Sequence, residues 1–401
     1  MENSANVERK LNAHVMATYS RFDVVIASGH GATATGADGQ TYIDFGSGIG
    51  VNCLGYADPG WVKAVSGQAA KVAHISNLYY SPVQAELAEM LCGVTGFDKV
   101  FFANSGAEAN EGLIKLARKY SFDKYGKGRA TVVTLRNSFH GRTVTTLSAT
   151  GQEVFHNYFF PFTEGFKLAE PNDCAGMEEA LTGDVCAVLL EAVQGEGGVC
   201  PLDPGFVKKT AELAKEKDIL LFFDEVQTGI GRTGTFFAYE QYGVKPDAVS
   251  CAKAIAGGLP MGAVLCAKQL SGVLTPGTHA TTFGGTPIVC AAAKEVVGRV
   301  SRPEFLAAVK EKAAYIHQKL AGMDGVENVR GLGLMLGLDT PGLAAGAVAA
   351  QAAKEGLLIL TAKQSLRMLP PLVITKDEID RGFAILQHVI TEMKSGGTVS
   401  H

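Results

Sequence analysis

The sequence predicts an α/β protein in which a large domain with a mostly parallel sheet is joined to a smaller α+β domain. From about residue 80, short apolar segments such as "DVCAVLLEA", "DILLFFDE" and "DAVSCAK" alternate with amphipathic ones such as "GFVKKTAELAKEKD". Strands that are apolar throughout are typical of a parallel sheet covered by helices on both faces. After about residue 290 helical patterns dominate, and only short strand patterns such as "GLGLMLGL" lie between them.

These patterns divide the chain into three segments. We expect residues 1–50 to form an N-terminal segment that belongs to the small domain, residues 51–290 the large α/β domain, and residues 291–401 the C-terminal small α+β domain. Within the first segment, "ATATGADGQTYIDF" predicts a hairpin with "DG" at its turn. The segment "SPVQAELAEMLCGVTG" predicts a helix with Ser81 as N-cap, Pro82 at its first position and a capping box completed by Gln84.

Composition narrows the classes of function. The 401 residues carry a net charge of −4 and 19% charged residues, so no basic surface predicts nucleic-acid binding. The apolar runs are too short to span a bilayer, and the N-terminal residues lack the apolar core of a signal peptide. The eight cysteines are scattered without a CxxC pair, which predicts no metal site and a reducing compartment. We therefore expect a cytoplasmic protein without membrane or nucleic-acid partners, acting on small molecules.

Chemically informative residues follow four of the predicted strands, at the sheet edge where α/β proteins bind ligands. Gly106 and Ala107 begin the helix after "KVFFA", where free backbone N–H groups favour a phosphate. Asp224 follows "ILLFF", where a carboxylate needs a partner such as a protonated ring nitrogen, a backbone N–H or an arginine. Lys253 follows "DAVSCA", where partial desolvation favours a nucleophilic amine.

The fourth strand, "ATVVTLRNS", is followed by Phe139, which can stack on a planar ring, and by Arg142, whose planar guanidinium suits a substrate carboxylate. Each of these residues alone has an ordinary structural explanation. Together, a phosphate cradle, an aromatic platform, a buried carboxylate and an amine nucleophile are the groups needed to hold pyridoxal phosphate.

The chain resembles the class III pyridoxal-phosphate-dependent aminotransferases over nearly its whole length, and among them it is most similar to the acetylornithine aminotransferases. The segments that carry the resemblance are "TYSR", "DFGSGIGVNCLG", "SNLYY", "FFANSGAEANE", "SFHGRT", "EAVQGEGGV", "FFDEVQTGIGRTG", "CAKAIAGGLPMGA", "HATTFGGTP" and "RMLPPLVIT". The resemblance implies the fold type I of pyridoxal-phosphate enzymes, with the cofactor bound in the large domain.

The resemblance also implies a role for individual residues. Lys253 forms the Schiff base with the cofactor and moves protons, and Asp224 holds the proton of the pyridine nitrogen. The other implied cofactor contacts are Gln227 to the ring hydroxyl, Phe139 and Val226 to the two ring faces, and Gly106 and Ala107 to the phosphate. Thr282 is expected to reach the phosphate from the neighbouring subunit, which implies a homodimer.

For the substrates, the resemblance implies ping-pong transfer of the ω-amino group of N2-acetylornithine to 2-oxoglutarate, giving N-acetylglutamate 5-semialdehyde and glutamate. Arg142 and Arg367 are the expected carboxylate clamps, and Tyr19 is expected to line the substrate pocket. Glu196 is expected to pair with Arg367 until glutamate binds, and a static salt bridge between the two is the alternative.

Several other functions stay open. Ornithine, 4-aminobutyrate or succinylornithine could be the amino donor within the same family. Gly48 stands where the ornithine enzymes carry a tyrosine, which argues against free ornithine. A Rossmann oxidoreductase is disfavoured because neither "GEGG" nor "GIGRTG" stands between a first strand and a helix. A non-catalytic paralogue would have no need of Lys253.

Overall fold

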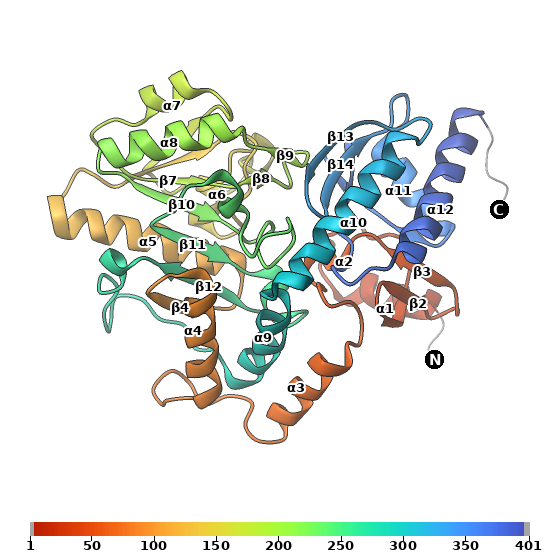
Figure 1. Ribbon diagram of the computed structural model, residues 1–401, viewed down its shortest axis with the longest axis horizontal. Coiled ribbons are helices and arrows are strands. Elements are labelled where there is room, and N and C mark those ends of the chain that lie inside the picture. The colour runs from red at the N-terminus through yellow and green to blue at the C-terminus, as the bar shows by residue number, and fades with distance from the viewer. Residues whose placement is uncertain (1–3, 397–401) are drawn as a thin grey trace.

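The computed structural model describes residues 4–396, which form two lobes (Figure 1). The larger lobe is built on a seven-stranded sheet. In spatial order its strands are β4 (Lys99–Ala103), β12 (Gly262–Cys266), β11 (Ala248–Cys251), β10 (Leu220–Asp224), β7 (Val185–Leu190), β5 (Thr131–Leu135) and β6 (Phe166–Ala169). Strand β12 pairs antiparallel with both of its neighbours, and the other pairings are parallel. The predicted mostly parallel sheet is confirmed.

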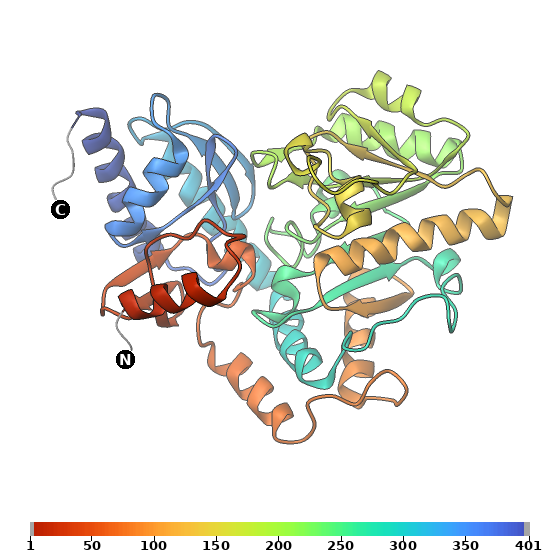
Figure 2. The same ribbon diagram turned by 180° about the vertical axis from the view of Figure 1, so that it is seen from behind.

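Helices cover both faces of this sheet, as the uniformly apolar strands predict. In β10, Leu220 and Phe222 pack in the cluster that includes the buried side of α5 (Gly106–Tyr125), which crosses one face (Figure 2). Leu221 and Phe223 pack in the cluster that includes the buried side of α8 (Pro204–Glu216), on the opposite face. A strand buried on both faces has no position for a polar side chain except at its ends.

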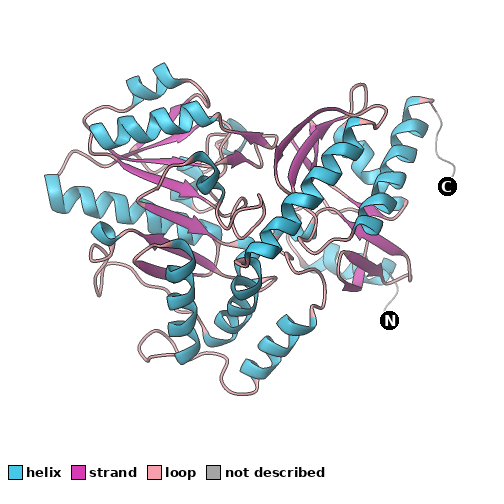
Figure 3. Ribbon diagram, viewed as in Figure 1, coloured by secondary structure: helices cyan, strands magenta, loops and turns pink. Residues whose placement is uncertain are grey.

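The smaller lobe contains two four-stranded sheets with helices outside them (Figure 3). One sheet has the order β1 (Ile26–His30), β2 (Thr33–Gly36), β3 (Thr41–Asp44) and β15 (Leu357–Leu358). The other has the order β13 (Glu327–Leu332), β14 (Met335–Asp339), β17 (Ser365–Met368) and β16 (Leu360–Ala362). The helices of this part are α10 (Pro303–Ala321), α11 (Ala345–Lys354) and α12 (Lys376–Lys394).

The N-terminal and C-terminal parts of the chain share the first of these sheets. Strand β3 pairs in parallel with β15, so that Ile43 lies opposite Leu357 and Asp44 opposite Leu358. This pairing supports the proposed division in which residues 1–50 belong to the small domain. The hairpin expected around "DG" is formed by β2 and β3, with Thr35 opposite Thr41.

The helix predicted to begin after Ser81 is α4 (Pro82–Thr95), and Ser81 Oγ accepts from the backbone N–H of Gln84. The expected capping box is absent. The Gln84 side chain instead donates to Asn77 Oδ1 at 2.9 Å and to the backbone oxygen of Gly285 at 3.0 Å. The Gln84 side chain is therefore bonded to Asn77 and to the distant Gly285, and not to the backbone N–H of Ser81 that a capping box requires.

None of the helices formed by residues 4–396 is both long and apolar enough to cross a bilayer. The remaining helices are α1 (Ser4–His14), the short turn α2 (Ser47–Gly50), α3 (Pro59–Ala69), α6 (Val144–Ala149), α7 (Cys174–Ala180) and α9 (Pro287–Val300). The remaining short elements are β8 (Val193–Gln194), β9 (Cys200–Pro201), η1 (Glu153–Phe155), η2 (Ala238–Tyr242), η3 (Lys253–Ala256) and η4 (Lys268–Leu270).

Candidate functional site

A cavity of about 410 Å³ lies at the carboxyl ends of the large sheet's strands. Apart from Val51, its lining comes from the segments that follow β4, β5, β7, β10 and β11, because the carboxyl ends of parallel strands meet at one edge of a sheet. Eight of the residues predicted from the sequence line it, namely Gly106, Ala107, Phe139, Arg142, Asp224, Val226, Gln227 and Lys253.

The start of helix α5 forms one end of the cavity. Ser105 is the N-cap, and its hydroxyl accepts from the Glu108 N–H at 3.1 Å. The N–H groups of Gly106 and Ala107 lie in the first turn and have no partner within the helix. A methyl group at Gly106 would lie 2.7 Å from Val226 Cγ1, so this position requires glycine. The free N–H groups and the helix dipole suit an anion.

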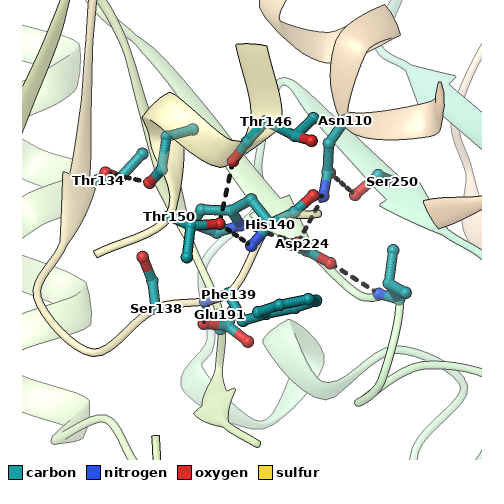
Figure 4. A network of polar contacts seen from close by, with 12 residues as sticks. Asn110, Thr134, Ser138, Phe139, His140, Thr146, Thr150, Glu191, Asp224 and Ser250 are labelled. Carbon is teal, nitrogen blue, oxygen red and sulfur yellow. Dashed lines mark hydrogen bonds and ion pairs between the residues drawn. The ribbon is translucent and has the colours of Figure 1, made fainter. Parts of the chain in front are cut away.

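Asp224, at the end of β10, lies at the centre of a buried hydrogen-bond network (Figure 4). Its Oδ2 accepts from Asn110 Nδ2 at 2.7 Å and is 2.8 Å from His140 Nδ1. Its Oδ1 accepts from the Val226 N–H at 3.0 Å. The Ser250 hydroxyl donates to Asn110 Oδ1 at 2.6 Å, which turns the amide nitrogen of Asn110 toward Asp224. These contacts to both carboxylate oxygens fix the orientation of Asp224.

Glu191 follows β7 and lines the same cavity, with 6% of its surface exposed. It accepts one hydrogen bond, from the Phe139 N–H to Oε2 at 3.0 Å. Burial, and then the negative charge of Asp224, raise the pKa of the Glu191 carboxyl well above its ordinary value. Two neighbouring buried acids do not both ionise readily. The raised pKa favours the protonated form of Glu191.

Lys253 comes just after β11 and is the first residue of η3. Its φ of +44° lies in the left-handed region, where non-glycine residues are strained, and such strain is concentrated at functional sites. The residue is half-buried and faces the cavity. Burial lowers the pKa of the Lys253 ammonium, and the nearby carboxylates of Glu196 and Asp224 partly oppose this. A lowered pKa makes the neutral amine more available as a nucleophile.

Arg367, on β17 of the smaller lobe, pairs with Glu196 of the larger lobe at 2.6 Å. The Arg367 side chain is only 4% exposed, and it also donates to Gln227 Oε1 at 3.1 Å. Burial alone would raise the pKa of Glu196, but the guanidinium of Arg367 more than offsets this and leaves the pKa below its ordinary value. The predicted partners therefore meet as a charged pair that joins the two lobes.

Four of the predicted residues are not part of the cavity lining within one chain. Glu196 and Arg367 contact the cavity residue Gln227, whereas Tyr19 and Thr282 lie apart from it. Tyr19 is 73% exposed and contacts the Arg21 guanidinium, whose central carbon is 5.8 Å from the ring centroid. Thr282 is exposed and lines a separate hollow of about 870 Å³ together with Leu78 and Tyr80. The sequence analysis expected Thr282 to act on a neighbouring subunit's site, and this stays a prediction.

Four residues around Asp224 were not predicted from the sequence, namely Asn110, His140, Glu191 and Ser250. Glu191 could have been predicted, because it is a carboxylate directly after the apolar strand "VCAVLL" and needs a partner there, as Asp224 does after "ILLFF". His140 stands beside Phe139 in a segment already singled out. Asn110 and Ser250 had no signal, because only the packing of α5 on β11 brings them together.

Within the described part of the chain, no three His, Cys, Asp or Glu side chains are grouped so that they could hold a metal ion. Five of the cysteines are buried, namely Cys53, Cys186, Cys251, Cys266 and Cys290.

Residues 15–390 match the family described as Aminotransferase class-III. The acetylornithine aminotransferase of Haemophilus ducreyi is 49% identical over 388 residues, which cover 96% of this chain and 98% of that protein. Among solved structures, the ornithine aminotransferase of Toxoplasma gondii has a TM-score of 0.94 at 29% identity, covering 99% of this chain and 97% of that one. The N-acetylornithine aminotransferase of Stenotrophomonas maltophilia has a TM-score of 0.84 at 35% identity, covering 97% of this chain and 99% of that one.

The family match spans almost the whole chain and includes every residue that lines the cavity. The relative from Haemophilus ducreyi aligns over nearly its full length, so both lobes are shared. This chain belongs to the class-III aminotransferase family.

Proposed function

We propose that the protein transfers the ω-amino group of N2-acetylornithine to 2-oxoglutarate, giving N-acetylglutamate 5-semialdehyde and glutamate, with pyridoxal phosphate as cofactor. One observation carries the chemistry. The amine of Lys253 and the carboxylate of Asp224 face one cavity from the ends of the neighbouring strands β11 and β10. The choice of donor is supported by the acetylornithine aminotransferases that are 41–49% identical to this chain over nearly its full length.

The residues of the cavity fit pyridoxal phosphate. The free N–H groups of Gly106 and Ala107 suit its phosphate, Phe139 offers an aromatic face, and Asp224 offers a charged carboxylate for the ring nitrogen. Lys253 supplies the amine for covalent attachment. When bound, the cofactor supplies an electron sink for the carbanion formed at the substrate carbon.

The remaining steps belong to the chain's own side chains. With pyridoxal phosphate bound, Lys253 Nζ would be the group that takes up and returns the substrate proton, a role that its lowered pKa favours. Asp224 would hold the ring nitrogen of the cofactor, and its contacts with Asn110, His140 and the Val226 N–H fix the orientation of its carboxylate. Arg142 lines the cavity and Arg367 pairs with Glu196 at its side, so two guanidinium groups are placed to bind substrate carboxylates.

Free ornithine is the second candidate donor, because the solved structure with a TM-score of 0.94 is an ornithine aminotransferase. Gly48 argues for the acylated donor. Its φ is +64°, and a methyl group there would lie 3.5 Å from Asn52 Nδ2. Glycine leaves open the space that a tyrosine would occupy in the ornithine enzymes, next to the cavity residue Val51.

We also infer that the protein works as a homodimer in the cytoplasm. Leu78, Tyr79, Tyr80 and Phe283 are large apolar side chains that are each at least 61% exposed in the single chain. Two of the four, Leu78 and Tyr80, line the same hollow as Thr282. A second subunit over this surface would remove the apolar side chains from water and carry Thr282 toward the partner's cavity.

The test is the visible absorption of the purified protein with pyridoxal phosphate, before and after addition of N-acetylornithine, ornithine or 4-aminobutyrate. The proposal expects the band of the bound cofactor to bleach fastest with N-acetylornithine and to recover with 2-oxoglutarate as glutamate forms. If the band bleached fastest with another amine, that amine would be the preferred donor. A protein that binds no pyridoxal phosphate would overturn the proposal.

A further inference from the structure

Arg142 and Arg367 are held in place by different kinds of partner. Arg367 is held by the carboxylate of Glu196, whose Oε1 accepts from Nη1 at 2.6 Å and so competes with a substrate carboxylate for that nitrogen. Arg142 has no ion pair and no side-chain hydrogen bond with any of residues 4–396. It is an exposed residue at the cavity, and an arginine of this kind is expected to sample many rotamers unless something holds it.

The guanidinium of Arg142 is held by the aromatic ring of Phe155. The central carbon of the Arg142 guanidinium lies 4.0 Å from the ring centroid of Phe155 and 5.5 Å from that of Phe139. The two rings contact each other edge to face, with centroids 5.9 Å apart and an interplanar angle of 79°. Arg142 therefore packs against the same pair of rings that includes the proposed platform for the cofactor.

The segment that carries Phe155 is tied to the segment that carries Phe139 and Arg142. The backbone N–H of Phe155 donates to the Gln152 oxygen at 3.1 Å, and the buried Gln152 side chain donates to the Ser138 oxygen at 3.1 Å. On the other side, His156 Nε2 lies 2.8 Å from the Leu147 oxygen. Phe155 is thus fixed relative to Arg142 by contacts on both sides.

Stacking and ion pairing use different parts of a guanidinium. A ring attracts its flat face, whereas a carboxylate binds the N–H groups along its edge. A ring can therefore restrict the motion of Arg142 without competing with a substrate carboxylate. Glu196, in contrast, competes with the substrate for Arg367. We propose that Phe155 is a positioning residue that holds Arg142 ready for the carboxylate of the substrate. This inference rests on the proposed function, in which Arg142 binds a substrate carboxylate.

The test compares F155L, which removes the ring but keeps an apolar side chain, with F155Y, which keeps the ring. The matched control is F159L, because Phe159 belongs to the same segment, is 57% exposed and contacts the ring of Tyr158. We expect F155L to raise the KM for 2-oxoglutarate about two- to fivefold with kcat unchanged, the size typical of an exposed cation–π contact. F155Y and F159L should keep the KM of the parent protein.

A second comparison separates positioning from a general structural role. In an R142A background the F155L substitution should have no further effect on KM, because the group it positions is gone. Calorimetric binding of glutarate, a dicarboxylate that is not turned over, should weaken by the same factor in F155L alone. Equal KM values for F155L and F159L, or an effect of F155L that persists with R142A, would overturn the inference. A parent protein without transaminase activity would instead count against the proposed function.

Discussion

His140 Nδ1 and Asn110 Nδ2 both contact the same oxygen of Asp224, at 2.8 Å and 2.7 Å. The His140 side chain is fully buried, and its Nε2 has no partner among the described residues. The proton of a neutral His140 therefore lies on Nδ1, where the carboxylate accepts it. This contact fixes the orientation of Asp224.

His140→Ala is expected to lower the free energy of unfolding by about 1.5–3 kcal/mol, the range for a hydrogen bond to a charged group. It should also weaken binding of pyridoxal phosphate, because Asp224 loses a contact that fixes the orientation of its carboxylate. His140→Asn, whose amide nitrogen can stand near the position of Nδ1, should restore part of both quantities. Urea unfolding and fluorescence titration with the cofactor measure them, and an equal loss in Ala and Asn variants would contradict the role of this donor.

Glu191→Gln is expected to leave the visible spectrum and the affinity for the cofactor nearly unchanged at pH 7. Burial and the charge of Asp224 raise the pKa of Glu191, so the substitution replaces one neutral group with another of similar shape. Asp224→Asn, which removes the only charge of the pair, should weaken cofactor binding strongly. If Glu191→Gln and Asp224→Asn were equally damaging, the conclusion that Glu191 is protonated would be wrong.

Lys253→Ala is expected to abolish turnover and to leave the cofactor bound only non-covalently. Borohydride treatment followed by mass spectrometry measures the covalent link directly, since reduction makes it permanent. The parent protein should gain the mass of the reduced cofactor and the variant should not. Lys268→Ala is the matched control, because Lys268 is an exposed lysine in the short helix η4. If the Lys253 variant gained the mass of the reduced cofactor to the same extent as the parent protein, another residue would be the nucleophile.

Glu196→Gln is expected to favour glutamate over the ω-amino donor. The substitution removes the charge that occupies Arg367, so the α-carboxylate of glutamate binds without displacing a partner. The ratio of kcat/KM for the two donors should shift by about tenfold, as expected for one charged hydrogen bond. Glu153→Gln is the control, because Glu153 pairs with Arg136 at 3.8 Å on the surface. An unchanged ratio would favour the static salt bridge.

Burial of the Glu225 carboxyl is expected to lower the free energy of unfolding as the pH rises. Burial raises the pKa of this fully buried carboxyl from 4.5 to about 7. Because the folded pKa is the higher one, the group stabilises the fold fully below pH 4.5, and this contribution is lost as the pH rises through 7. Glu225→Gln should therefore reduce the decrease in unfolding free energy between pH 5 and pH 8, by about 3 kcal/mol at most. Urea unfolding at both pH values measures this, and parallel pH profiles would contradict it.

Local patterns were enough to predict most of the fold. The apolar strands predicted a sheet covered on both faces, and "DG" between two strand patterns predicted the hairpin of β2 and β3. The capping box at Gln84 was wrong because the side chain bonds to Gly285, two hundred residues away. Tyr19 was expected in the cavity and lies outside it in the single chain.

The pattern of residues along the chain is enough to predict the kind of site, because polar residues directly after apolar strands must lie at the carboxyl edge of a parallel sheet. That rule placed Asp224, Lys253, Phe139 and Gly106 together before any coordinates were known. Their protonation and their partners depend on burial and on contacts between distant segments, and these are known only from the folded structure. Asn110 reaches Asp224 across 114 positions of sequence, and Phe155 meets Arg142 only through the path of the loop between them.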